Sequence, residues 1–130
     1  MTDHELLRRA AMAAGHEVSR IADDRRALLL FGVIAPWNSL DDDGDALRLA
    51  IAVPAIEVSA ILEGARVAHP ADETQRGAFV RRAITSAAAE AWLAHYKAKL
   101  ESGQRVEAVK EYRMATGASL PEAQRALGIK

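Results

Sequence analysis

Four carboxylates fall within five consecutive positions of the chain, at Asp41, Asp42, Asp43 and Asp45. So close a group could hold a divalent cation, because calcium and magnesium prefer oxygen ligands. A calcium loop of the EF-hand type also needs glycine at its sixth position and glutamate at its twelfth. Counted from Asp41, both of those positions are alanine. The group fits the start of a helix better, where carboxylates cap free N–H groups and face the positive end of the helix dipole.

Other residues with catalytic or ligating chemistry are scattered. The four histidines, His4, His16, His69 and His95, include no pair four residues apart, and the chain has no cysteine. Disulfides, thiol catalysis and cysteine-ligated metals are therefore excluded. Since no nucleophile motif, phosphate loop or dinucleotide fingerprint occurs, we expect no enzymatic activity, no metal and no cofactor. A metal-dependent or catalytic role for the segment Trp37–Asp45 is kept as an alternative.

A second group of functional candidates lies near the C-terminus, where the pattern predicts a helical hairpin. The expected helices are 104–116 and 120–127, with Gly117 in the left-handed conformation that ends the first one. Pro121 stands at the first helical position of the second, where its missing N–H costs nothing. A helix-turn-helix DNA reader also has two short helices joined by a glycine turn, so nucleic-acid binding stays open.

The spacing of apolar residues predicts the elements that position these groups. A helix capped at Thr2 or Asp3 runs to Gly15. Apolar stretches at 16–21 and 27–31 predict two antiparallel strands joined by a turn at 22–26. A helix capped by Asn38 or Ser39 should end at Pro54. Its expected buried stripe is Leu40, Leu47, Ala50 and Ile51.

The middle of the chain predicts two more strands and a long helix. Alternating residues at 55–62 and 65–69, with Glu63 and Gly64 between them, favour a second hairpin of strands. A helix follows over 72–101, either broken near His95 or projecting. Trp92, Tyr96 and Leu100 form a stripe on it at four-residue spacing, which either packs under the hairpin or body or forms the seam of a homodimer.

These elements predict an α+β fold: a four-stranded, mainly antiparallel sheet packed by helices, with a C-terminal helical hairpin. The expected domains are residues 1–100 and an appendage at 101–130. The net charge is −1, which gives no overall field favouring nucleic acid or anionic membrane. The chain has neither a signal-peptide core nor an apolar run of membrane-spanning length, so we expect a cytoplasmic protein that does not associate with membranes.

Residues 37–50, WNSLDDDGDALRLA, resemble a phage and prophage domain of unknown function, the phage "ABA sandwich" domain. The similarity covers about residues 1–92 and includes the opening 1–7, the apolar run 27–30, and residues 81–84 and 87–90. It implies a phage or prophage origin and a sheet packed by helices, and no reaction.

Residues 103–123, GQRVEAVKEYRMATGASLPEA, resemble the helical hairpin of the bacterial ribosomal stalk protein's C-terminal domain. In that family the hairpin docks translation factors. The resemblance therefore implies a partner-binding role for the residues at the matching positions, which are Arg105, Val106, Val109, Lys110 and Arg113. The sequence as a whole thus predicts a small phage-derived, non-enzymatic binding or accessory protein that presents a helical hairpin to a macromolecular partner, with a protein partner favoured. The alternative is a nucleic-acid-binding regulatory protein that uses the same hairpin.

Overall fold

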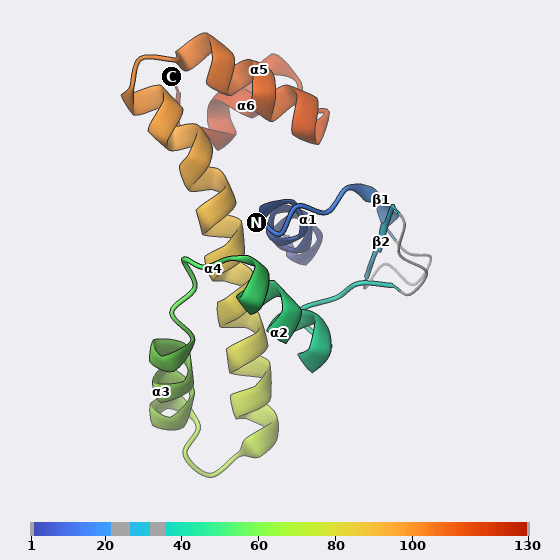
Figure 1. Cartoon of the computed structure of the whole chain (residues 1–130), viewed down its shortest axis with the longest axis vertical. Coiled ribbons are helices and arrows are strands. Elements are labelled where there is room, and N and C mark those ends of the chain that lie inside the picture. The colour runs from blue at the N-terminus through green and yellow to red at the C-terminus, as the bar shows by residue number, and fades with distance from the viewer. Residues whose placement is uncertain (1, 22–26, 32–35, 130) are drawn as a thin grey trace. The chain divides into compact units, whose positions relative to one another are not determined.

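The computed structural model describes residues 2–21, 27–31 and 36–129, and the chain forms two compact units (Figure 1). Unit 1 is Met1–Ala91 and unit 2 is Trp92–Lys130. Unit 1 contains α1 (Asp3–Ala13), β1 (Val18–Ile21), β2 (Leu28–Leu30), α2 (Asp43–Ala52), α3 (Val58–Ala68) and residues 73–91 of α4 (Glu73–Glu101). Unit 2 contains residues 92–101 of α4, then α5 (Arg105–Thr116) and α6 (Leu120–Ala126).

The first helix begins and ends close to where its sequence signals lie. Thr2 caps α1 by accepting a hydrogen bond from the backbone N–H of Glu5, and the Glu5 carboxylate accepts one from the N–H of Thr2. Gly15 follows the helix with a φ of 85°, a conformation that glycine adopts without strain. The buried face of α1 consists of Leu6, Leu7, Ala10 and Ala11.

The predicted four-stranded sheet is wrong: the chain is mostly helical, and its described part contains a single two-stranded sheet. The first predicted pair of strands is confirmed as β1 and β2, which run antiparallel with Val18 opposite Leu30 and Ile21 opposite Leu28. The turn expected at 22–26 lies outside the described residues.

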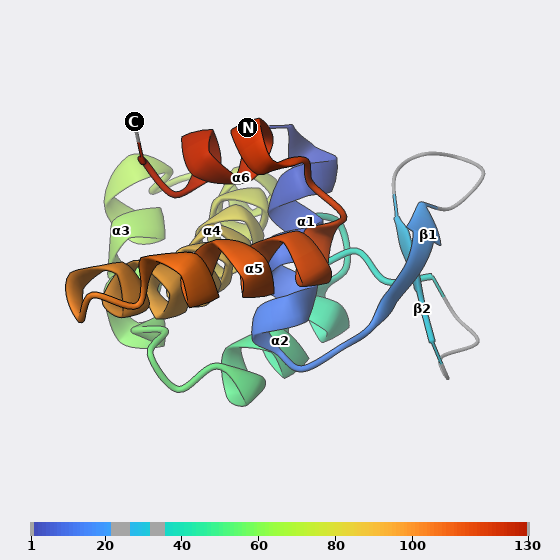
Figure 2. The same cartoon turned by 90° about the horizontal axis from the view of Figure 1, so that it is seen from above.

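The second predicted pair of strands is replaced by α3. Val58, Ile61 and Ala65 follow one another at intervals of three and four residues, and all three are packed into the protein. Helical burial of this row prevails over the two-residue alternation that favoured strands. Gly64, expected in a tight turn, is inside the helix, where an added Cβ would lie 3.4 Å from the ring of Phe79. Figure 2 shows α3 beside α4.

The predicted start of α2 is also wrong, and its predicted buried stripe holds only for Leu40 and Ala50, which are partly buried against the core. Asp42 caps this helix, accepting a hydrogen bond from the N–H of Asp45 at 2.8 Å. Leu40 precedes the helix, so the predicted helical stripe that began at Leu40 is not the buried face of α2. Leu47 and Ile51 are 60% and 72% exposed. The residues that α2 buries are Asp45, Ala46 and Leu49.

The core of unit 1 lies among α1, α2, the two strands and α4. Its members from α4, Ile84 and Ala88, belong to the same buried cluster as Leu7, Leu28 and Leu49. A fully buried pair of hydroxyls joins the segment before α2 to α4, where Ser39 Oγ lies 2.7 Å from Thr85 Oγ1. The long helix predicted over 72–101 is confirmed as α4, and of the two alternatives the break near His95 is wrong, because the helix is continuous there. Among the described helices, none has both the length and the apolar character needed to cross a bilayer.

Candidate functional site

Local signals in the sequence build the α5–α6 hairpin of unit 2. Gly117 adopts the left-handed conformation, with φ 73°, and its N–H donates to the carbonyl of Arg113 at 2.8 Å. Ser119 then caps α6 by accepting from the N–H of Glu122 at 3.3 Å. Pro121 lies in the first turn of α6, where no intrahelical donor is required. The left-handed glycine expected after the first helix is thus confirmed.

Small residues close the hairpin. Ala108 of α5 and Ala123 of α6 are both completely buried, which allows the two helices to approach closely. Val109, Tyr112 and Leu127 are also buried in the described part of unit 2. Among the residues that the structure describes, these five form the apolar interior of the hairpin.

Three aromatic rings connect α5 with the last turns of α4. The ring centroid of Trp92 lies 4.9 Å from that of Tyr96 and 5.5 Å from that of Tyr112. Burial, followed by the charge of Glu111 and then Tyr112, raises the pKa of Tyr96. Trp92 and Tyr96 are 9% and 6% exposed, so little of either ring is left for the seam between two copies that the stripe also suggested.

An ionic cluster lies on the side of α5 that faces α4. Lys99 Nζ donates to the Glu111 carboxylate at 2.5 Å, and His95 Nε2 lies 3.7 Å from the other carboxylate oxygen. The hydrogen bond from Lys99 is the main reason that the pKa of Glu111 is lowered, with His95 adding to the effect. The acidic side chain is thus turned toward α4 and does not line the outer face of the hairpin.

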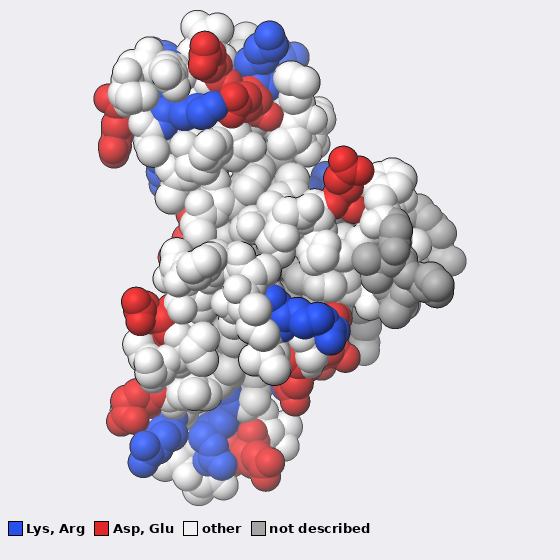
Figure 3. All heavy atoms as spheres, viewed as in Figure 1, with Lys and Arg blue, Asp and Glu red and all other residues white. Residues whose placement is uncertain are grey.

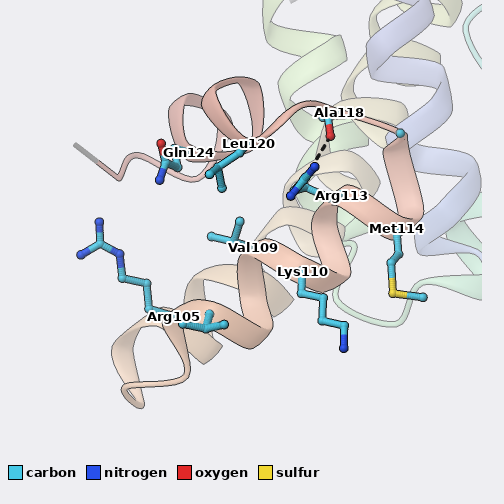
Figure 4. A pocket seen from close by; sticks show the side chains of 10 residues that line it. Arg105, Val109, Lys110, Arg113, Met114, Ala118, Leu120 and Gln124 are labelled. Carbon is cyan, nitrogen blue, oxygen red and sulfur yellow. Dashed lines mark hydrogen bonds between the residues drawn. The ribbon is translucent and has the colours of Figure 1, made fainter.

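The outer face of the hairpin carries an open groove of about 680 Å³, which we call the hairpin groove (Figure 4). It is lined by Arg105, Val106, Val109, Lys110, Arg113, Met114, Gly117, Ala118, Leu120 and Gln124. All five residues that the sequence singled out as partner-binding candidates are on its walls. In Figure 4, Val109 and Leu120 face one another from α5 and α6, while Lys110 and Met114 extend from α5 on the side away from α6.

The hairpin groove combines an exposed apolar lining with positive charge. Val106, Met114 and Leu120 are 81%, 77% and 44% exposed. Arg113 is held by its own hairpin, since its Nε donates to the carbonyl of Ala118 at 3.3 Å. The described residues that line the groove include three cations and no carboxylate. An apolar surface next to cationic groups is typical of a binding site and is not needed for a helix that only faces water.

Unit 2 as a whole is basic, although the chain is nearly neutral. Its acidic residues are Glu101, Glu107, Glu111 and Glu122, whereas its basic residues are Lys97, Lys99, Arg105, Lys110, Arg113, Arg125 and Lys130. On the face of unit 2 that Figure 3 shows, acidic and basic side chains lie side by side. The excess of positive charge is therefore moderate, and the hairpin groove is where its cations occur without carboxylates.

The sequence reasoning did not single out the other five groove residues as contacts, and these are Met114, Gly117, Ala118, Leu120 and Gln124. Met114 follows Lys110 by four residues and could have been assigned to the same face of α5. Leu120 is nearly half exposed at the first position of α6. Gln124 carried no signal of its own, because its place depends on how α6 packs on α5.

The alternative site at Trp37–Asp45 has its carboxylates engaged within the protein. Asp43 accepts from Arg81 Nη1 at 2.7 Å, and Asp45 accepts from the N–H of Asn38 at 3.0 Å. Asp42 caps α2, as described above. Over the described ranges, no three histidine, cysteine, aspartate or glutamate side chains are grouped so that they could hold a metal ion.

The open cavity between α3 and α4 is lined by both signs of charge. It measures about 700 Å³, and its walls include Arg66, Glu73 and Arg76. Arg76 Nη1 donates to the carbonyl of His69 at 2.9 Å, which ties the end of α3 to α4. The hydrogen bond of Arg76 at this cavity therefore holds α3 against α4 within unit 1.

Comparison with protein families, with curated proteins and with solved structures gave no match to the chain.

Proposed function

We propose that the chain is a non-enzymatic binding or accessory module that docks a protein partner in the hairpin groove. The observation that carries this proposal is that the sequence and the structure, considered separately, point to the same residues. The resemblance to the stalk hairpin singled out five residues of α5, and the same five line the open hairpin groove, next to Met114 and Leu120. The phage or prophage origin suggested by residues 37–50 belongs to the same proposal.

Exposure of the groove's apolar residues supports a role in binding. Val106 and Met114 are more than three-quarters exposed, so they are not part of the buried interior of the hairpin. Burying a valine and a methionine side chain against a partner would contribute about 1.5–3 kcal/mol each before the costs of association. Folding leaves these side chains exposed, whereas docking would bury them, so a binding partner explains their presence on this face best.

A capture experiment with matched variants tests the proposal. The tagged full chain is incubated with a lysate of the cells in which it naturally occurs, and captured proteins are quantified by mass spectrometry. Proteins should be captured by the wild type and by Arg125→Glu, whose exposed side chain lies outside the groove, and lost with Val106→Asp and Arg113→Glu. Equal capture by all four proteins would show that the groove is not the docking face.

Nucleic-acid binding through the same hairpin is the second candidate, favoured by the basic excess of unit 2. Phosphate contacts make such binding strongly dependent on salt. A labelled DNA duplex titrated at low and moderate salt tests this alternative. Binding at low salt that Lys110→Glu and Arg113→Glu abolish would support it, and no binding at low salt would exclude it.

A further inference from the structure

The two rows of side chains on the outer face of α5 each alternate charge with apolar surface. One row is Arg105, Val109 and Arg113, and the adjacent row is Val106, Lys110 and Met114. Residues four apart on a helix are neighbours on one face, so each cation of a row stands next to an apolar side chain. The first row places Val109 between two arginines, and the second places Lys110 between two apolar residues. Leu120 of α6 faces Val109 across the groove, and these two residues form its apolar centre (Figure 4).

We infer that the occupant of the hairpin groove is an acidic amphipathic helix of a partner protein. This inference rests on the proposed function above and adds the chemistry of the partner. Arg105 and Arg113 are eight residues apart on α5, about 12 Å along the axis at 1.5 Å per residue. A partner helix lying along α5 reproduces that distance with carboxylates seven or eight residues apart, and it places apolar residues between them.

The charges that line the hairpin groove determine the sign of the charge expected on the partner. The described residues lining the groove offer three cations and no carboxylate, while Glu111 is engaged with Lys99 on the other side of α5. Exposed charge pairs at the rim of such a site speed association and select the partner, and the apolar centre supplies most of the affinity. Met114 adds adaptability, because its unbranched thioether side chain packs against varied surfaces.

The same features disfavour nucleic acid as the occupant. The described lining contains no aromatic side chain on which a base could stack. Valine, leucine and methionine side chains gain nothing from a phosphate backbone. A short basic groove with an apolar centre therefore fits a protein helix better than a duplex or a single strand.

A peptide selection with the full chain tests the inference. A displayed library of random 16-residue peptides is selected on the wild type, and recovered peptides are synthesised and titrated by fluorescence anisotropy. We expect sequences enriched in Asp and Glu seven or eight residues apart with Leu, Ile or Phe between them. Their affinity should fall about tenfold or more with Lys110→Glu and with Arg113→Glu, change less than about twofold with Arg125→Glu, and weaken as salt is raised.

Each other outcome overturns a defined part of the argument. Neutral or basic peptides whose binding depends on Val106, Lys110 and Arg113 would refute the acidic helix and leave the proposed docking face intact. Peptides that bind all groove variants equally would refute the docking face itself. Recovery of no binder, displacement of the peptides by a DNA duplex at moderate salt, or concentration-dependent self-association that the groove variants abolish would each show that an acidic partner helix is not the occupant.

Discussion

The orientation of α2 can be tested with a matched pair of leucines. Leu49 is 2% exposed in the core of unit 1, whereas Leu47, two residues away on the same helix, is 60% exposed. Leu49→Ala should lower the free energy of unfolding of unit 1 by about 3 kcal/mol, because it removes buried methyl groups and leaves a cavity. Leu47→Ala should change it by less than about 0.5 kcal/mol, since alanine is an equally good helix former and little buried surface is lost.

The two tryptophans make the measurement specific for unit 1. Trp37 is buried in unit 1 and Trp92 in unit 2. In a Trp92→Phe background, the fluorescence of Trp37 therefore follows the unfolding of unit 1 in urea. Both leucine variants should share the m-value of the background, so that a shift of the midpoint reports stability alone. If Leu47→Ala costs as much as Leu49→Ala, α2 buries the face that its sequence pattern indicated, and the packing described here is wrong.

Three further predictions concern α3, the buried hydroxyls and the acid sensitivity of unit 2. Gly64→Ala should raise the stability of unit 1 to urea by about 0.5–1 kcal/mol, because glycine is unfavourable inside a helix and the new methyl group makes an ordinary contact; destabilisation would support the tight turn instead. Thr85→Val should lower the free energy of unfolding of unit 1 by about 1–3 kcal/mol, because it leaves Ser39 Oγ without its buried partner. Adding Ser39→Ala should recover part of this loss, whereas strictly additive losses would contradict the hydrogen-bonded pair. The stabilisation from Glu111 is complete above its ordinary pKa of 4.5 and is lost as the pH falls through the lowered pKa of the folded state. Acid should therefore lower the melting temperature of unit 2 more in the wild type than in Glu111→Gln. Parallel pH profiles of the two proteins would show that the hydrogen bond from Lys99 does not stabilise unit 2.

The hairpin could be predicted from the sequence because its signals are local. Gly117 ends α5 by a conformation that depends on one residue, and Ser119 and Pro121 begin α6 within three positions. Such signals act on backbone groups nearby, whatever the rest of the chain does. The same holds for the capping box of α1 at Thr2 and Glu5.

The sheet was over-predicted because short apolar segments fit two periods. Ile56 and Val58 suggest alternation, and β-branched residues favour strands. Val58, Ile61 and Ala65 suggest a helix equally well, and only packing against the rest of unit 1 decides between the two. Sequence reasoning cannot resolve such a conflict without knowing which face is buried.

The candidate site was predictable on α5 and not on α6 for a similar reason. The resemblance to the stalk hairpin identified Arg105, Val109 and Arg113, and their helical spacing places them on one face of a single helix. The contribution of Gln124 depends on the angle and register of α6 against α5, and these are set by the contact of buried alanines. No pattern within one helix contains that information.

Folding and docking use different residues of the hairpin apart from Val109, which is buried and also lines the groove, and this separation makes the function testable. Ala108, Tyr112 and Ala123 fill its interior, while Val106 and Met114 are exposed on its outer face. Substituting an exposed side chain changes stability little, whereas removing an apolar anchor from an interface weakens binding directly. A groove variant that keeps the melting temperature of unit 2 and loses its partner therefore identifies a docking residue, because loss of the fold would have lowered both.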